Sequence, residues 1–241
     1  MVITSLENKK IKDIKKLYDK QKRDSKGLFI VEGEHLVREA LKHHLLKEVI
    51  ALENTNIDFF DEVTYVTLPV LKRISNLDTP QSIMGVCNKK EEQEIGEKLL
   101  VLDNIQDPGN LGTIIRSAVA FDIDTIVLSK DTVDLYNPKV IRATQGMLFS
   151  INIIVRDLEV FLADIHQKKY HIYGTNVTNG KSLKSIEKVK KFAIIMGNEG
   201  SGVKETLKKH IDENIYIDMN NNCESLNVGV AASIILYEFS K

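Results

Sequence analysis

The second half of the chain alternates short runs of Val, Ile and Leu with longer helical patterns, and this alternation restricts the fold more than any other feature. The apolar runs occupy residues 99–105, 125–129, 150–155, 170–175, 191–197 and 214–218. Helical patterns separate the earlier runs, over residues 112–121, 138–148 and 160–167. Continuous apolar strands joined by helices are typical of a parallel sheet that is buried on both faces. We therefore predict an α/β domain built on such a sheet.

A smaller α/β unit is predicted ahead of this domain. Strand patterns occupy residues 28–31, 47–52, 62–67 and 82–87, and amphipathic helical patterns occupy residues 34–41 and 68–75. The charged, poorly patterned stretch 88–98 is typical of an exposed linker. The predicted domains are therefore residues 1–95 and residues 96–241.

Charge and cysteine content limit the classes of function that the chain can have. The formal net charge is −1 and the isoelectric point is near 6.6, so any nucleic-acid surface must be a local basic patch. Cys87 and Cys223 lie far apart, and neither they nor the histidines show metal-ligand spacing, which predicts no metal site and a reducing compartment. The first residues lack an apolar leader, and the apolar run 228–237 is too short to span a bilayer. We expect a cytoplasmic protein without a membrane partner.

The first 26 residues are the most basic part of the chain. They contain nine Lys and Arg residues against four Asp and Glu residues, while Ile11, Ile14 and Leu17 follow helical spacing. The pattern by itself favours a solvated amphipathic helix over a phosphate-binding face. Support for the second interpretation must come from elsewhere in the chain.

A strand-to-helix junction at residues 99–121 is the first candidate for a site. The strand is predicted to end near Ile105, a tight Asp-Pro-Gly-Asn turn follows, and a helix begins around Leu111. Such a junction exposes backbone N–H groups that bind anions. Arg116 lies on the same side as the turn, where it can hold a phosphate or form a surface ion pair.

A glycine-rich loop follows the apolar run 192–196. Three glycines occur within the six residues 197–202, so the backbone there must bend sharply or approach a neighbour closely. The plainer interpretation is a strand-to-helix turn that Ser201 caps. Glu199 favours a functional loop, because turns of this kind rarely need a carboxylate.

The third candidate is the polar stretch before the last apolar segment. Ser225 or Glu224 can cap a helix that runs to Phe239, with Asn227 in its first turn. One polar group is enough for capping and three are present. The surplus predicts a binding site.

Together these stretches resemble the three signature motifs of the SpoU (TrmH-like) branch of the SPOUT RNA methyltransferases. The matches are Asn110, Gly112 and Arg116 in N-x-G-x-x-x-R, residues 197–202 in G-N-E-G-x-G, and residues 225–228 in S-L-N-V. The first domain resembles the family's small L30e-like substrate-binding domain over residues 29–41 and 79–86. The resemblance implies a SPOUT domain with a deep trefoil knot, an exception to the rule of unknotted chains. It also implies S-adenosylmethionine as cofactor and a homodimer whose active site is completed across the interface.

The implied reaction is methyl transfer to a ribose 2′-hydroxyl in structured RNA, either ribosomal or transfer RNA. The resemblance assigns the catalytic positions to Arg116, Asn110, Glu199, Ser225 and Asn227, and the cofactor contacts to Gly197, Ile217, Met219, Ser225 and Leu226. A guanidinium almost never loses its proton, so we expect Arg116 to clamp the adjacent phosphate and stabilise alkoxide charge. Glu199, Asn110 or a water then takes the proton. An RNA substrate makes a phosphate-binding face the favoured interpretation of the basic first 26 residues, because phosphate neutralisation supplies much of the affinity for RNA.

Three positions depart from the usual family pattern, namely Asp122, Asp218 and Gly229, and none of them is a signature residue. Competing hypotheses are an RNA-binding or ribosome-associated protein without turnover and a knotted enzyme that methylates a base. A dehydrogenase is disfavoured, because the glycine fingerprint and the ribose-binding acid of the dinucleotide fold are missing. The sequence carries no readable code for the RNA or for the nucleotide.

Overall fold

The structure is a computed structural model that describes residues 2–177 and 179–241. The chain divides into two compact units, and each is built from segments that are separate in sequence. The first unit combines the residues up to Glu91 with Asp134–Phe149, and the second combines Glu92–Val133 with Ser150–Lys241.

The first unit contains a mixed sheet with the strand order β1-β4-β3-β5-β2. Strands β1, β4 and β3 pair in parallel, whereas β5 pairs antiparallel with both β3 and β2. Its elements are β1 (Val2–Ile3), α1 (Lys9–Lys15), the 3-10 turn η1 (Lys16–Tyr18), α2 (Lys20–Lys26), β2 (Leu28–Glu32), α3 (Glu34–Lys42), β3 (Leu46–Leu52), β4 (Val63–Val66), α4 (Leu68–Ile74) and β5 (Ile83–Asn88).

The two faces of this sheet are covered by different helices. Ile30, Ile50 and Met84 belong to one core with the apolar side chains of α1, η1 and α4. Helix α3 packs against β5, β2 and β3 through residues such as Val37. The predicted strands and helices of this unit are all present, within two residues of their predicted ends.

The basic N-terminal stretch forms two short helices and a 3-10 turn. Asp19 adopts an extended backbone conformation (φ −81°, ψ 131°), and its side chain accepts a hydrogen bond from the backbone N–H of Lys22. An N-cap residue has this conformation, so Asp19 ends η1 and starts α2.

The segment 134–149 belongs to the first unit although it follows the second strand of the second unit. It contains α6 (Pro138–Thr144) and the 3-10 turn η2 (Met147–Phe149). The Phe29 ring lies 4.8 Å from that of Tyr136 and 6.0 Å from that of Phe149, measured between centroids. Buried Arg23 forms an ion pair with Asp134. These contacts join residues more than 100 positions apart.

The second unit contains a parallel sheet with the strand order β10-β12-β9-β11-β6-β7-β8, and every neighbouring pair in it is parallel. The predicted parallel α/β domain is therefore confirmed. Its elements are β6 (Lys98–Leu102), α5 (Pro108–Ala120), β7 (Thr125–Ser129), β8 (Asn152–Arg156), α7 (Leu158–Gln167), β9 (His171–Thr175), β10 (Lys181–Ser182), η3 (Leu183–Ser185), β11 (Phe192–Met196), α8 (Glu205–Lys208), β12 (Glu213–Tyr216) and α9 (Val228–Ser240).

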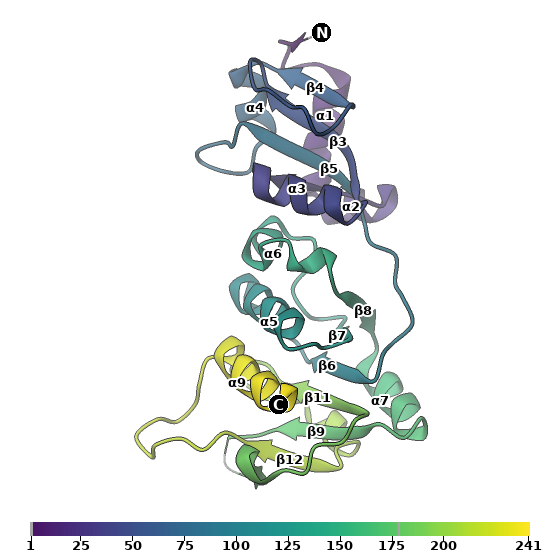
Figure 1. Cartoon of the computed structure of the whole chain (residues 1–241), viewed down its shortest axis with the longest axis vertical. Helices are drawn as coiled ribbons and strands as arrows, with labels where there is room; N and C mark the ends of the chain where they lie inside the picture. The colour runs from purple at the N-terminus through teal and green to yellow at the C-terminus, as the bar shows by residue number, and fades with distance from the viewer. Residues whose placement is uncertain (1, 178) are drawn as a thin grey trace. The chain divides into compact units, whose positions relative to one another are not determined.

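Helices cover both faces of this sheet. Side chains such as Leu99, Val101 and Ile195 form a core with α7. On the other face, the Phe239 ring of α9 lies 5.0 Å from the rings of Tyr173 and Phe192. Helices α9 and α5 pack against each other (Figure 1). Among the described helices, none is both long and apolar enough to cross a membrane.

Candidate active site

Helix α5 places Asn110 in its first turn. The helix begins at Pro108, because Asp107 adopts an N-cap conformation and its Oδ1 accepts a hydrogen bond of 2.8 Å from the backbone N–H of Asn110. Proline suits the first helical position, where its missing N–H group is not needed. The predicted turn over residues 107–110 is therefore wrong. Those residues form the start of the helix, three residues earlier than Leu111.

The loop after β11 is held in a closed shape by Asn198. The backbone groups of Asn198 and Gly202 exchange hydrogen bonds of 3.0 and 2.9 Å, and Asn198 Oδ1 accepts from the backbone N–H groups of Gly200 and Ser201. A Cβ atom on Gly197 would lie 2.2 Å from the backbone of Gly202 and Val203, so this close approach requires glycine. Asn198, rather than Ser201, organises the loop that presents Glu199.

Helix α9 begins after Asn227, which is its N-cap. Asn227 Oδ1 accepts from the backbone N–H groups of Gly229 and Val230 at 2.9 and 3.3 Å. The expectation that Ser225 or Glu224 caps this helix, with Asn227 inside it, is wrong. An Asn side chain is among the best N-caps, so this amide oxygen is committed to the helix.

The three loops meet in a chain of side-chain hydrogen bonds. Asn227 Nδ2 donates to Asn110 Oδ1 at 2.9 Å, and Asn110 Nδ2 donates to Glu199 Oε1 at 2.9 Å. The direction of both bonds follows from the helix cap: Asn227 Oδ1 faces two N–H donors, so its amino group must face Asn110. The amino group of Asn110 is then left for the Glu199 carboxylate. Residues separated by as many as 117 positions thus form one cluster.

A cavity of about 450 Å³ lies beside this cluster. All five residues predicted to contact the cofactor line it, and Glu199 lines it as well. The volume is in the range of small-molecule sites. Further lining side chains are apolar, from Val228, Ala231 and Ile235 at the start of α9. The lining residues are Thr175, Asn176, Val177, Met196, Gly197, Asn198, Glu199, Gly200, Ser201, Gly202, Val203, Lys208, Ile211, Asn214, Ile215, Tyr216, Ile217, Met219, Ser225, Leu226, Val228, Ala231 and Ile235.

Comparison with protein families accounts for this arrangement. The family model described as "SpoU rRNA Methylase family" matches residues 97–237, which include all three loops. The chain belongs to this family. A second model, described as "MRM3-like substrate binding domain", matches residues 8–85. The resemblance inferred from the three motifs is therefore confirmed.

Relatives of this SpoU-family chain include two curated rRNA methyltransferases. The 23S rRNA (guanosine(2553)-2'-O)-methyltransferase RlmP of Bacillus subtilis is 39% identical over 242 residues, covering 98% of this chain and 97% of its own. The 23S rRNA (guanosine-2'-O-)-methyltransferase RlmB of Xanthomonas campestris is 33% identical over 141 residues, covering 58% and 57% of the two chains. The crystal structure of an AdoMet-bound rRNA methyltransferase from Sinorhizobium meliloti matches with a TM-score of 0.87, 29% identity and coverage of 99% and 97%.

Arg116, a signature residue of the family, stands apart from the cluster. It is exposed on α5, and no hydrogen bond or ion pair of its side chain is found within residues 2–177 and 179–241. Asn110 and Arg116 are six residues apart, which is roughly 9 Å along a helix axis. The structure thus brings Asn110, Glu199 and Asn227 together and places Ser225 in the cavity wall. Among the described residues, the guanidinium of Arg116 has no partner.

Asp103 holds the chain just after the glycine-rich loop 197–202, and no sequence pattern predicts this role. Its side chain is buried at the end of β6, where Oδ2 accepts a hydrogen bond of 2.8 Å from the backbone N–H of Lys204. The ammonium of Lys204 bonds Asp131 at 2.9 Å and lies 3.6 Å from Asp103 Oδ1. Its hydrogen bond to Asp131 raises the pKa of Lys204, and nearby Asp103 adds to this shift. A single charged residue at the end of an apolar strand gives no sequence signal of this role.

Proposed function

We propose that this chain is an S-adenosylmethionine-dependent methyltransferase that acts on a ribose 2′-hydroxyl of ribosomal RNA. The observation that carries the proposal is the Asn227–Asn110–Glu199 hydrogen-bond chain at the edge of the 450 Å³ cavity. It joins all three family motifs at one point. The full-length relative RlmP, named as a 23S rRNA guanosine 2'-O-methyltransferase, supports the same reaction.

The cavity suits S-adenosylmethionine, which has an aromatic adenine ring with apolar faces at one end and charged ammonium and carboxylate groups at the other. Ile217 and Leu226 offer backbone groups and apolar contacts, while Ser225 and the backbone beside Gly197 offer polar ones. Met219 lies in the same wall. When bound, S-adenosylmethionine supplies a methyl group on a sulfonium, whose carbon–sulfur bond breaks as the ribose oxygen bonds to the methyl carbon.

Glu199 is the clustered side chain that can take the proton of the ribose hydroxyl. The amide oxygens of Asn110 and Asn227 already accept hydrogen bonds, and neutral amides are poor bases. One carboxylate oxygen of Glu199 accepts from Asn110, which fixes the direction of the group. Holding the hydroxyl oxygen, the methyl carbon and the sulfur in line contributes several kcal/mol to rate enhancement by orientation, up to roughly 7–11 kcal/mol. Asn110 and Asn227 act as positioning residues for the carboxylate of Glu199, which accepts the hydroxyl proton.

Arg116 clamps the phosphate next to the target ribose and stabilises charge on the 2′-oxygen. Its guanidinium is exposed, and a guanidinium offers a rigid, cationic fork of N–H donors that fits a phosphate. Replacement of Arg116 by Ala is expected to abolish methylation while calorimetry detects unchanged S-adenosylmethionine binding, because the residue does not line the cavity. Full residual activity would reject this role.

The proposal includes a homodimer, supported by an apolar stripe on α9. Val230, Ile234 and Tyr237 are 46%, 38% and 52% exposed, and spacings of four and three residues place them on one helix face. A second copy that covers this stripe would remove it from water. The active site of the dimer is then completed across the interface, as the family resemblance implies.

The remaining parts of the proposal concern the architecture. Residues 1–95 are proposed as an L30e-like RNA-binding domain and residues 96–241 as the methyltransferase domain, whose segment 134–149 packs with the first compact unit. In the latter, the carboxy-terminal segment passes through a loop as a trefoil knot. The joint lining of the cavity by residues after β11, residues after β12 and the start of α9 supports such a crossing. The protein acts in the cytoplasm, where ribosomal RNA is the substrate.

Mapping of 2′-O-methyl groups in RNA from cells with and without the gene tests the proposal. One or more ribose methyl groups should disappear from ribosomal RNA on deletion and return with the wild-type gene. Loss of a base methyl group instead would favour a base-methylating enzyme. An unchanged methylation pattern would favour an RNA-binding protein without turnover.

A further inference from the structure

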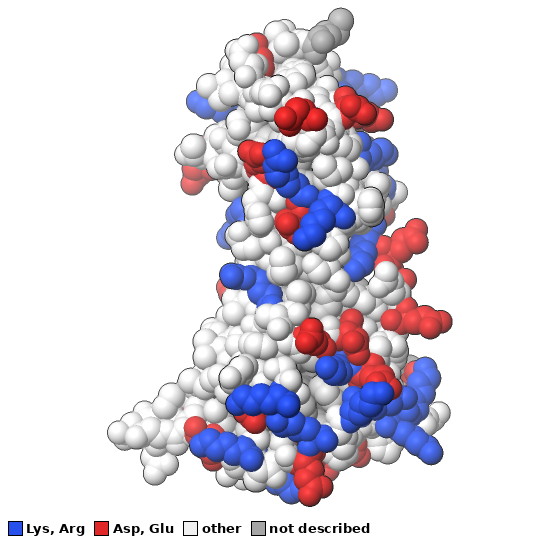
Figure 2. Space-filling view, viewed as in Figure 1, with Lys and Arg blue, Asp and Glu red and all other residues white. Residues whose placement is uncertain are grey.

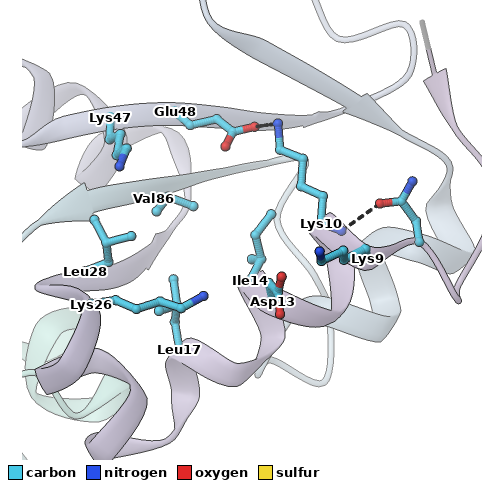
Figure 3. A pocket seen from close by; sticks show the side chains of 11 residues that line it. Lys9, Lys10, Asp13, Ile14, Leu17, Lys26, Leu28, Lys47, Glu48 and Val86 are labelled. Carbon is cyan, nitrogen blue, oxygen red and sulfur yellow. Dashed lines mark hydrogen bonds and ion pairs between the residues drawn. The ribbon is translucent and has the colours of Figure 1, made fainter.

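A cleft of about 600 Å³ lies in the first unit between α1, α2 and the sheet, and we call it the α1 cleft. Figure 3 shows four apolar side chains, Ile14, Leu17, Leu28 and Val86, between the strand that carries Lys47 and the helices that carry Lys9 and Lys26. The α1 cleft shares no lining residue with the 450 Å³ cavity proposed to bind S-adenosylmethionine. Its lining residues are Asn8, Lys9, Lys10, Asp13, Ile14, Leu17, Lys26, Leu28, Lys47, Glu48 and Val86.

The floor of the α1 cleft consists of side chains at the margin of the first unit's hydrophobic core. Ile14, Leu17 and Val86 are 6%, 3% and 4% exposed and belong to the core between α1 and the sheet, while Leu28 packs against it partly buried. The floor is therefore a firm apolar surface built from two layers. It gives a planar ring a place to lie without rearrangement of the core.

A β-bulge turns Lys47 toward the cleft. The register between β3 and β5 shifts between Leu46 and Glu48, which pair with the successive residues Cys87 and Val86. Lys47 is the extra residue. Neighbouring residues of a regular strand point to opposite faces, yet Lys47 and Glu48 both line the cleft, and bulges re-aim side chains in this way.

The two carboxylates of the α1 cleft, those of Asp13 and Glu48, each form an ion pair with a lysine of the first unit. Glu48 forms an ion pair with Lys10 and accepts a hydrogen bond from Thr64 at 2.5 Å. Asp13 bonds Lys16 at 2.9 Å, and this hydrogen bond lowers the pKa of Asp13. What remains is three exposed ammonium groups, those of Lys9, Lys26 and Lys47, for which no ion pair is found among the described residues.

Positive charge continues on the other flank of α1. A second cleft of about 450 Å³ there is lined by Leu6, Ile11, Lys12, Lys15, Lys16 and Arg73. Elsewhere, on the face that Figure 2 shows, basic and acidic side chains are interspersed, in line with the net charge of −1. The concentration of unpaired lysines around α1 is a local feature, as a nucleic-acid contact in a nearly neutral protein must be.

We propose that the α1 cleft binds an unpaired nucleotide of the RNA substrate. The base or ribose lies on Leu28 and Val86, and Lys9, Lys26 and Lys47 contact the flanking phosphates. Three cations around an apolar floor match a nucleotide, which carries an apolar ring face between two phosphates. A paired strand cannot offer its base to this floor, so the ligand is an unpaired loop or end. The inference rests on RNA being the substrate, and it assigns the recognition of that RNA to a named surface.

The test compares two triple variants of the full chain. Lys9→Ala, Lys26→Ala and Lys47→Ala together remove the cleft cations. The control combines Lys72→Ala, Lys139→Ala and Lys169→Ala, which removes equal charge from exposed lysines outside both the cleft and the basic first 26 residues. Affinity for a fluorescent single-stranded oligouridylate and for a duplex RNA of equal length is measured by anisotropy over a range of salt concentrations. Circular dichroism confirms that each variant is folded, and calorimetry measures its binding of S-adenosylmethionine.

The cleft variant should bind the single strand at least about tenfold more weakly, with the slope of log affinity against log salt reduced by about 2, since each single-strand phosphate contact contributes roughly 0.7. The control should stay within about twofold of the wild type, and an oligonucleotide with 4-thiouridine should cross-link to peptides that contain Leu28 or Val86.

Equal losses in the two variants, an equal loss on duplex RNA, or cross-links confined to the second unit would each overturn the inference. Retained S-adenosylmethionine binding and methylation in that case would leave the proposed function intact. A wild-type chain that binds the oligonucleotide in the cleft but does not bind S-adenosylmethionine would instead contradict the proposed function alone.

Discussion

Asn110 makes one hydrogen bond on each side, and the direction of the two bonds determines what its neighbours do. The amide accepts from Asn227 and donates to Glu199, so the helix cap of α9 ultimately orients the carboxylate. The orientation of the Glu199 carboxylate therefore depends on which atom of each amide, oxygen or nitrogen, faces its partner.

Replacement of Asn110 by Asp removes the donor to Glu199 and places two carboxylates next to each other. We expect methyl transfer to fall by at least about a hundredfold, as when a single group of a preorganised polar site is lost. Binding of S-adenosylmethionine, measured by calorimetry, should stay within a few fold, because Asn110 does not line the cavity. Asn56→Asp makes the same chemical change at an exposed position and serves as the control. Wild-type activity in Asn110→Asp would contradict a catalytic role for the Asn227–Asn110–Glu199 hydrogen-bond chain.

Two substitutions separate the two tasks of Asn227. Asp at this position still caps α9 through its oxygens but cannot donate to Asn110, whereas Ala does neither. Urea unfolding should show Asn227→Ala less stable by about 1 kcal/mol and Asn227→Asp close to the wild type. Both should lose methyl transfer. An active Asn227→Asp variant would show that the side chain serves only as a cap.

At the scale of elements, buried polar groups tie the helices of the first unit to its sheet. The carboxylate of Glu32 on β2 accepts from the Tyr18 hydroxyl at 2.8 Å, the Ser75 hydroxyl at 2.5 Å and the backbone N–H of Asn76 at 3.1 Å. These bonds hold η1 and the end of α4 against one strand. Burial, and next the charge of Glu32, raise the pKa of Tyr18.

This raised pKa predicts a pH dependence. Above pH 10.0, the ordinary tyrosine pKa, the unfolded chain loses the Tyr18 proton while the folded chain keeps it. The unfolded state then binds fewer protons, so the free energy of unfolding falls as pH rises, by up to about 1.4 kcal/mol per pH unit. Below pH 10 this contribution is fully present. Tyr18→Phe should therefore lose stability less steeply than the wild type in urea titrations between pH 10 and 11.5.

The control for this experiment is Tyr65→Phe, on β4, whose hydroxyl makes no hydrogen bond in the described part of the chain. It should follow the wild-type slope. At pH 8, Tyr18→Phe should be less stable by about 1 kcal/mol through loss of one hydrogen bond. Parallel curves for Tyr18→Phe and the wild type would contradict the assignment.

The elements also mark where sequence patterns are informative. Apolar strands and amphipathic helices were predicted to within a few residues, because their periodicity is local. The start of α5 was missed, because Asp-Pro-Gly occurs both in turns and at helix starts. The bond from Asn227 to Asn110, the bond from Asn198 to the Asn104 carbonyl and the contacts of buried Asp103 depend on partners distant in sequence. The return of residues 134–149 to the first unit depends on rings such as Phe29 and Tyr136, which leave no periodic signal.

At the scale of the whole molecule, the exposed stripe on α9 predicts the assembly. Ile234→Asp places a charge in the middle of the stripe and should convert a dimer to a monomer in sedimentation velocity. Val160→Asp, at a 70% exposed position on α7, is the control and should remain dimeric. If the wild type sediments as a monomer at micromolar concentrations, the stripe has another partner or none.

Transfer of an isotopically labelled methyl group to ribosomal RNA gives a direct test of the proposed 2′-O-methyltransferase activity. Purified wild-type chain, labelled S-adenosylmethionine and ribosomal RNA from cells lacking the gene are incubated for a single turnover, and digested nucleosides are analysed by mass spectrometry. We expect the label on a ribose 2′-oxygen, with no transfer by Arg116→Ala. A label on a base, or no labelled nucleoside from the wild type, would contradict this expectation.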